Sequence, residues 1–487
     1  LSKATGNYSS AYGTLANASG LASMAFGAGA NANKTGAIAH GVNSIASGAN
    51  ASTFGTEANA TAEDAIALGH RATASGEDAI AIGKSALANK VNSIAIGSEA
   101  RAIAINTTAV GDNANATSKN ATAIGFSSQA TGGQALAVGY NAKASSGWGG
   151  SAVGASSRAL GNHSTSIGAW SNANGNNSIA LGFSACAISN YSIAIGANSD
   201  STGINTTAVG TNASALANYS SSYGTLANAS GLASMAFGAG ANASNTGAIA
   251  HGVNSTASGA NSSAFGTEAI ASSDDAIAIG YTAIANKINA TAIGSGALAT
   301  GTNATALGDA AKASGDQSTA VGRGAKANKS SAVAVGHAAI ASGARAAAFG
   351  QGAKASEADS VAIGYSSVGN GTLSTAIGSY ANATAQDSVT IGYLSNATAE
   401  DSLAIGKSSI ANEVNAIAIG TEAKATANNS IAFGDNAEAS GNQATTFGAS
   451  AVANQENATA VGEKAKATGT QSTAIGRQSL ANKHDAT

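Results

Sequence analysis

Residues 64–97 read DAIALGHRATASGEDAIAIGKSALANKVNSIAIG, and within this stretch a glycine follows an apolar tripeptide every 14 residues, beginning at Gly69. The same spacing continues outward in both directions, from Gly13 to Gly476. The chain of 487 residues holds 34 such glycines, and one longer step, in the turn over residues 140–154, adds a fifteenth residue. Self-similarity at a short fixed period indicates a repeat architecture.

Each column of the repeat has its own character when positions are counted from the glycine. Position −1 is large in all 34 turns, as at Ile82 and Ile96, position −2 is Ala in 29 turns, and position −3 is mostly large and apolar or Thr. This alternation has the period of a β-strand, and β-branched residues favour strands. A second short strand is predicted after the glycine, where position +3 is Ala or Ser, position +5 is nearly always Ala, and position +4 carries charges such as Lys143.

Two short strands and two tight turns make one coil of a flattened parallel β-solenoid, so the sequence predicts an all-β fold of about 34 coils with 14 residues each. The turns are rich in glycine and asparagine, which tolerate a left-handed backbone. Glycines at position +7, such as Gly20 and Gly76, are predicted to fill that role. No run of the chain differs from its neighbours, and we expect residues 1–487 to form one continuous domain in which the block 7–58 is duplicated as 218–269.

The expected core of each coil is thin. We expect the large side chains at −1 and −3 to point inward against the small ones at +3 and +5, which leaves the alanines at −2 on an outer face. A coil with so few large side chains buries too little apolar surface to offset the cost of ordering its residues. An apolar stripe of this kind should be covered, so we predict a homo-oligomer packed along its length, in an unspecified number of copies. The predicted contact column contains Ala81, Ala95, Ala109, Ala123, Ala278, Ala362 and Ala418.

Composition excludes several functional classes. The net charge of −3 lacks the basic excess of a nucleic-acid-binding protein. The single cysteine, Cys186, excludes an intrachain disulfide framework and is interpreted as an incidental free thiol. The six histidines are scattered, and no catalytic or metal-binding motif is present. We therefore expect no enzyme activity, no metal and no cofactor.

Two of the histidines occupy an unusual place. His40 and His251 lie at position −1, in equivalent turns of the duplicated block. The favoured interpretation is a neutral, hydrogen-bonded histidine in the core. The alternative is a three-fold histidine cluster that binds an ion or senses pH.

Aromatic residues gather near the one 15-residue turn. Exposed Trp and Tyr side chains in a polar surround are typical binding anchors, and the extra residue is expected to push Trp148 outward. The alternative is local packing without a binding role. The candidate contact residues are Phe126, Tyr140, Trp148, Trp170 and Phe183.

Three hexapeptides carry a family resemblance: NSIAIG at 92–97, DSVAIG at 359–364 and NSIAFG at 429–434. They resemble the N-S-V-A-I-G signature of YadA-like heads of trimeric autotransporter adhesins, and the resemblance extends over essentially the whole chain. It implies a left-handed parallel β-roll, three chains side by side, and display on the outer surface of a Gram-negative bacterium. It also implies that the stalk and the membrane anchor lie beyond Thr487.

The expected function is that of an adhesin head. A rigid trimeric rod without catalysis would attach to host matrix proteins, host cell receptors or other surfaces through many weak contacts. The alternatives are a structural spacer or a self-association module. A lattice-binding solenoid, for example one that binds ice, is less favoured because the outward columns lack flat threonine arrays.

Overall fold

The computed structural model describes residues 1–487 and contains only strands and turns. The chain forms two compact units, Leu1–Ser244 and Asn245–Thr487. No helix of the length and hydropathy needed to cross a membrane occurs. The first unit runs from β1 (Lys3–Ala4) to β35 (Asn242–Ala243), and the second runs from β36 (Ile249–His251) to β69 (Leu480–Ala481).

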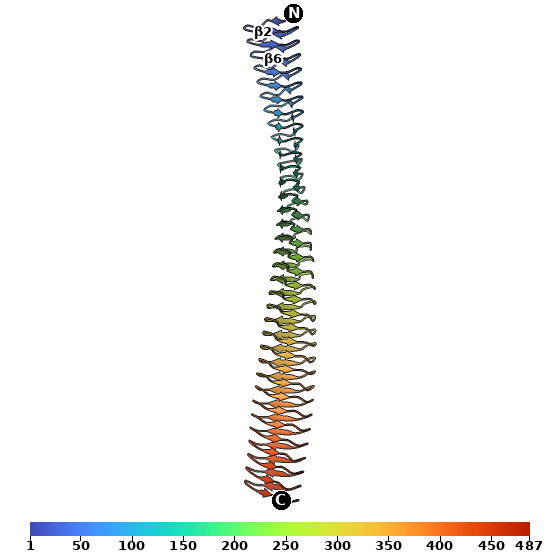
Figure 1. Ribbon diagram of the computed structural model, residues 1–487, viewed down its shortest axis with the longest axis vertical. Helices are drawn as coiled ribbons and strands as arrows, with labels where there is room; N and C mark the ends of the chain where they lie inside the picture. The colour runs from blue at the N-terminus through green and yellow to red at the C-terminus, as the bar shows by residue number, and fades with distance from the viewer. The chain divides into compact units, whose positions relative to one another are not determined.

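Two kinds of strand alternate through both units. Every even-numbered strand covers the three residues before a repeat glycine, as in β14 (Ile94–Ile96), and every odd-numbered strand covers positions +4 and +5, as in β15 (Arg101–Ala102). Strands of one kind pair in parallel with the same kind in the next coil, so that β12 (Ile80–Ile82) places Ile80 opposite Ile94. Figure 1 shows this stacking of coils within each unit. The prediction of a parallel β-solenoid with about 14 residues per turn is confirmed.

The core is built from small residues alone. Every buried apolar side chain is an alanine, at positions −4, −2, +3 or +5, as at Ala79, Ala81, Ala86 and Ala88 in one coil. Side chains larger than Ala or Ser occur among the fully buried residues only as threonine: Thr53, Thr107, Thr206, Thr390 and Thr446. The two sheets of a coil therefore approach too closely for Ile, Leu or Phe to fit between them.

The predicted direction of the first strand is wrong. Side chains alternate along a strand, so a shift of one residue exchanges the two faces completely. The columns at −1 and −3 point outward, and the alanines at −2 point into the coil. The predicted contact alanines consequently have no exposed surface: Ala81, Ala95, Ala109, Ala123, Ala278, Ala362 and Ala418. The second strand was predicted in the correct phase, with +3 and +5 inward and +4 outward.

Serine replaces alanine in the core because its hydroxyl has a local acceptor. Ser93 at position −4 donates a hydrogen bond of 2.6 Å to the carbonyl of Lys90, and Ser44 at position +3 donates one of 2.9 Å to the carbonyl of Gly41. A buried hydroxyl without a partner would cost free energy. Position −4, which holds only Ala, Ser, Thr or Gly in the sequence, is thus a fourth buried column.

The left-handed residues of the turns lie at +2 and −5, as at Ser85 and Asn92, each with φ of 55°. The prediction that glycine at +7 supplies this conformation is wrong, because Gly76 does not have a positive φ. Glycine is favoured there by close approach, since a Cβ on Gly76 would lie 2.1 Å from the carbonyl carbon of Lys90 in the next coil.

Candidate functional site

The even-numbered strands carry large aliphatic side chains on their outer face. In β10 (Ile66–Leu68), Ile66 is 39% exposed and Leu68 is 43% exposed, while the alanine between them is buried. Register pairing repeats this pattern from coil to coil within each unit, as between β10 and β12. The result is a column of apolar side chains, here called the aliphatic face, along one sheet of each unit. Large contiguous apolar patches of this kind mark interaction surfaces.

Near the start of the first unit the aliphatic face becomes aromatic. The rings of Tyr12 and Phe26 stack with centroids 5.0 Å apart, Phe26 lies 5.9 Å from His40, and His40 lies 5.6 Å from Phe54. The interpretation of His40 as a core residue is wrong, because position −1 points outward and His40 is exposed. His251 occupies the same outward position and its ring lies 5.8 Å from that of Phe265.

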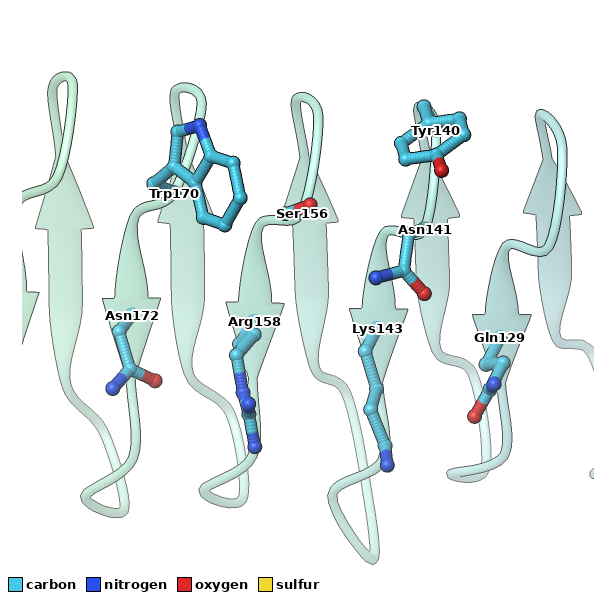
Figure 2. Close-up of a pocket in the computed structure, with 8 residues that line it drawn as sticks. All are labelled: Gln129, Tyr140, Asn141, Lys143, Ser156, Arg158, Trp170 and Asn172. Carbon is cyan, nitrogen blue, oxygen red and sulfur yellow. The ribbon is translucent and has the colours of Figure 1, made fainter.

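A groove of about 540 Å³ crosses the first unit at the turns that follow the repeat glycines. Tyr140 and Trp170 lie at these turns, two coils apart, and Ser156 occupies the coil between them (Figure 2). Tyr140 is 61% exposed and Trp170 is 64% exposed. The Tyr140 ring stacks on Phe126 with centroids 5.5 Å apart and an interplanar angle of 7°. The small serine between two large rings leaves the gap that forms the upper part of the groove.

Two cations lie on the adjoining strands. Lys143 in β21 (Lys143–Ala144) and Arg158 in β23 (Arg158–Ala159) are paired in register at position +4, and both line the groove. Their side chains run down the same sheet face below the aromatic turns (Figure 2). None of the ion pairs in the structure involves Lys143 or Arg158, and no acidic residue lines the groove.

Three amide side chains complete the lining. Gln129 and Asn172 flank the two cations in the same +4 column, through the pairings Gln129 with Lys143 and Arg158 with Asn172. Asn141 lies beside Tyr140, at the left-handed position of its turn with φ of 54°. Amide groups both donate and accept hydrogen bonds. The groove therefore combines exposed rings, unpaired positive charge and neutral hydrogen-bonding groups.

The predicted aromatic cluster divides between two edges of the solenoid. Phe126, Tyr140, Trp170 and Phe183 follow repeat glycines and share one edge. Trp148 lies in the opposite turn of its coil, between β21 and β22 (Ser151–Val153), and does not line the groove. The predicted grouping of Trp148 with the other four residues is thus wrong.

The extra residue of the 15-residue coil explains the separate place of Trp148. Pairing with the preceding coil keeps a 14-residue offset at Ala144 and has a 15-residue offset at Trp148, so the insertion falls in the turn that contains Trp148. Trp148 is 55% exposed, and its backbone N–H donates a 3.1 Å hydrogen bond to Asn162 Oδ1.

Titratable groups form no reactive centre. No group of three His, Cys, Asp or Glu side chains is placed to hold a metal ion. Cys186 is a free thiol. Burial raises the pKa of the Cys186 thiol, the neighbouring charge of Asp200 raises it further, and a hydrogen bond with Asn172 acts in the opposite direction. Burial also raises the pKa of the Asp200 carboxyl.

Comparison with known proteins agrees with this architecture. The family model for the YadA head domain repeat matches well over half of the chain. No curated protein matches the chain. The matched segments are 46–72, 60–86, 74–100, 102–128, 159–185, 173–199, 201–227, 229–252, 246–269, 271–297, 299–325, 327–353, 341–367, 370–395, 383–409, 411–437, 439–465, 453–479 and 467–487.

Among solved structures, the crystal structure of the collagen-binding domain of the Yersinia adhesin YadA is similar to the chain. The two are 24% identical over 36% of this chain and 68% of that chain, with a TM-score of 0.18. A TM-score this low supports no structural or functional argument. The family model, which recurs coil after coil along the solenoid, is sufficient to show that the chain belongs to the YadA head domain repeat family.

Proposed function

We propose that this chain is the adhesive head of a surface protein, and that it acts as a homotrimer without catalysis. Membership of the YadA head family supports an adhesin-type function. The proposed head is a left-handed β-roll, with three chains side by side, displayed on the outer surface of a Gram-negative bacterium. Residues 1–487 are proposed to form one continuous head, because the 14-residue spacing continues from Gly238 to Gly252 across the boundary between the two units.

The aliphatic face is the observation that supports assembly most directly. A sheet whose outward residues are Ile, Val, Leu and Phe in coil after coil exposes more apolar surface than a soluble monomer normally does. An alanine core contributes little hydrophobic stabilisation per coil, because burial scales with apolar area. Packing of the aliphatic faces of several chains would bury the large side chains that the coil itself excludes. The predicted homo-oligomer is thus proposed to form through positions −1 and −3.

The remaining surface is proposed to mediate adhesion. Polar turns and the +4 column stay outside the proposed contact and repeat at every coil. Several identical chains in one rod would present each surface feature in multiple copies, so weak contacts would add through avidity. The proposed partners are extracellular matrix proteins or cell-surface receptors of a host.

Attachment can be tested with the purified chain. Beads coated with residues 1–487 are flowed over surfaces carrying collagen, other matrix proteins, cultured cells or albumin, and retained beads are counted. Retention on matrix or cells above the albumin level supports the proposal. Equal retention on all surfaces would contradict it. Clumping of the beads with each other in the absence of a coated surface would instead indicate a self-association module.

A further inference from the structure

We propose that the groove formed by Tyr140, Lys143, Arg158 and Trp170 binds an anionic oligosaccharide. This inference rests on the proposed adhesive function and names a ligand class for one part of the surface. The groove lies on the turns and the +4 column, away from the aliphatic face, so it stays accessible when chains pack through positions −1 and −3. It also includes residues 129–158, which none of the matched family segments covers. The groove is thus a feature of this chain rather than of the repeat.

The two exposed rings provide the surface for sugar rings. Their backbones are two coil steps apart, about 10 Å at the spacing of parallel strands, and Ser156 between them keeps the gap open. The apolar C–H faces of a pyranose pack against aromatic rings, and both rings are more than half exposed. A short oligosaccharide can therefore contact both of them across the gap.

Trp170 occupies a backbone conformation that does not suit it. Its φ is 63°, in the left-handed region, which costs a side chain with a Cβ roughly 1–2 kcal/mol. Since the indole is 64% exposed, burial within the chain offsets little of this cost. Residues held in such conformations often have a functional role. The position is consistent with an indole kept at the surface for contact with a ligand.

The charge of the groove selects an anion. Lys143 and Arg158 are adjacent in register and lack acidic partners, so a carboxylate or sulfate placed between them would gain charge-assisted hydrogen bonds from both. The amides of Gln129, Asn141 and Asn172 then face the hydroxyl groups of the sugar, to which they can donate and from which they can accept. An acidic peptide would satisfy the cations but would present no rigid apolar ring face to both Tyr140 and Trp170.

The chain supplies matched controls for both features. Lys312 and Lys326 form a second register-paired cation pair at position +4, and no aromatic residue follows the glycines of their coils. Trp148 is an exposed tryptophan on the opposite edge. A contribution from positive charge alone would be lost equally in either cation pair. A contribution from any exposed indole would be lost equally with either tryptophan.

Binding is measured by calorimetry with four probes on the full chain. The probes are a heparin hexasaccharide (sulfated), a hyaluronan hexasaccharide (carboxylated), a neutral maltohexaose and a hexaglutamate peptide. We expect binding of one or both anionic sugars, with the sulfated and carboxylated arms identifying the anion, and binding of the neutral sugar and the peptide weaker by about tenfold or more. Equal binding of hexaglutamate, or no binding of either anionic sugar, overturns the proposal.

Variants locate the site. Trp170→Ala and the double variant Lys143→Ala/Arg158→Ala are each expected to weaken binding by about tenfold or more, whereas Trp148→Ala and Lys312→Ala/Lys326→Ala leave it unchanged. Far-UV circular dichroism and thermal melting confirm that each variant is folded. Equal losses in the control variants, or unchanged binding in the groove variants, overturn the assignment.

Bead attachment to matrix and cells is measured in parallel. Wild-type beads that attach while the chain binds neither sugar overturn the oligosaccharide inference and leave the adhesive function standing. A chain that binds the sugars without attaching to any surface overturns the proposed function and leaves the groove assignment standing.

Discussion

Ala95 in β14 is paired in register with Ala109 in β16 (Thr108–Val110), and neither side chain has any exposed surface. Their contact is one step of an alanine column that continues through the neighbouring coils. Large side chains cannot enter this column, because the facing sheet of the same coil is only an alanine or serine away. The next residue, Ile96, has an aliphatic side chain and lies on the outer face.

Enlarging the buried column should destabilise the fold. Ala95→Leu inserts three extra carbon atoms into a filled core, where overpacking typically costs about 1–3 kcal/mol or more. We expect a lower melting temperature by circular dichroism. Ala95→Ser is the matched control, because Ser166 and Ser222 occupy the same column naturally. Equal melting temperatures for the leucine and serine variants would show that the core is wider than the structure indicates.

The repeat glycine should be equally intolerant of a side chain. Gly97 has φ of 132°, and a Cβ on it would lie 2.5 Å from the carbonyl group of Gly111 in the next coil. Gly97→Ala therefore combines an unfavourable backbone conformation with a backbone clash, and we expect a loss of about 1 kcal/mol or more in the free energy of unfolding. Denaturant unfolding measures the loss, and Ser98→Ala, one residue later at the exposed turn, should leave the midpoint unchanged.

Periodicity was enough to predict the solenoid, its coil length and the direction of the second strand. The first strand was assigned the wrong face because large apolar residues are usually buried, and here they are the ones excluded. Position −4 held the missed signal: it is restricted to small residues like −2, +3 and +5, and four small columns in alternation leave no room for Ile82 or Ile96 inside.

Part of the candidate site was also accessible from the sequence. Tyr140 and Trp170 were identified because aromatic residues are rare in this chain. Their partners Lys143 and Arg158 were not, because a charge in the +4 column looks the same wherever it occurs. Only the register between β21 and β23 shows that two cations adjoin the aromatic turns. The sequence also could not show that Trp148 belongs to the other edge, since that depends on where the inserted residue is accommodated.

Asp200 should make the stability of the first unit depend on pH. Burial raises the pKa of its carboxyl above the unfolded value near ~3.9. Between the unfolded and the folded pKa the native state binds more protons than the unfolded state, so stability falls as pH rises through this window and the full penalty persists above it. Asp200→Asn removes the ionised group, and we expect a higher melting temperature than wild type at about pH 7 and no difference at about pH 3.

The control for the Asp200 experiment is Glu438→Gln. This substitution also removes a carboxylate from the +4 column, but at an exposed position. A gain in stability at neutral pH that is equal in the two variants would indicate a general charge effect and would contradict the role of burial.

Thiol cross-linking can identify the face through which chains assemble. In a Cys186→Ser background, Ile96→Cys places a thiol on the aliphatic face, Arg101→Cys places one on the outer face of the other sheet, and Ala95→Cys places one in the core. If chains pack through positions −1 and −3, a short bis-maleimide should join chains efficiently only in the Ile96→Cys variant. Three-chain products on a denaturing gel would fix the number of copies, each chain contributing 46.1 kDa. The Ala95→Cys thiol should stay unreactive until the protein is unfolded, because Ala95 is fully buried. Single chains from Ile96→Cys, together with linked chains from Arg101→Cys, would place the contact on the other sheet and contradict the role of the aliphatic face.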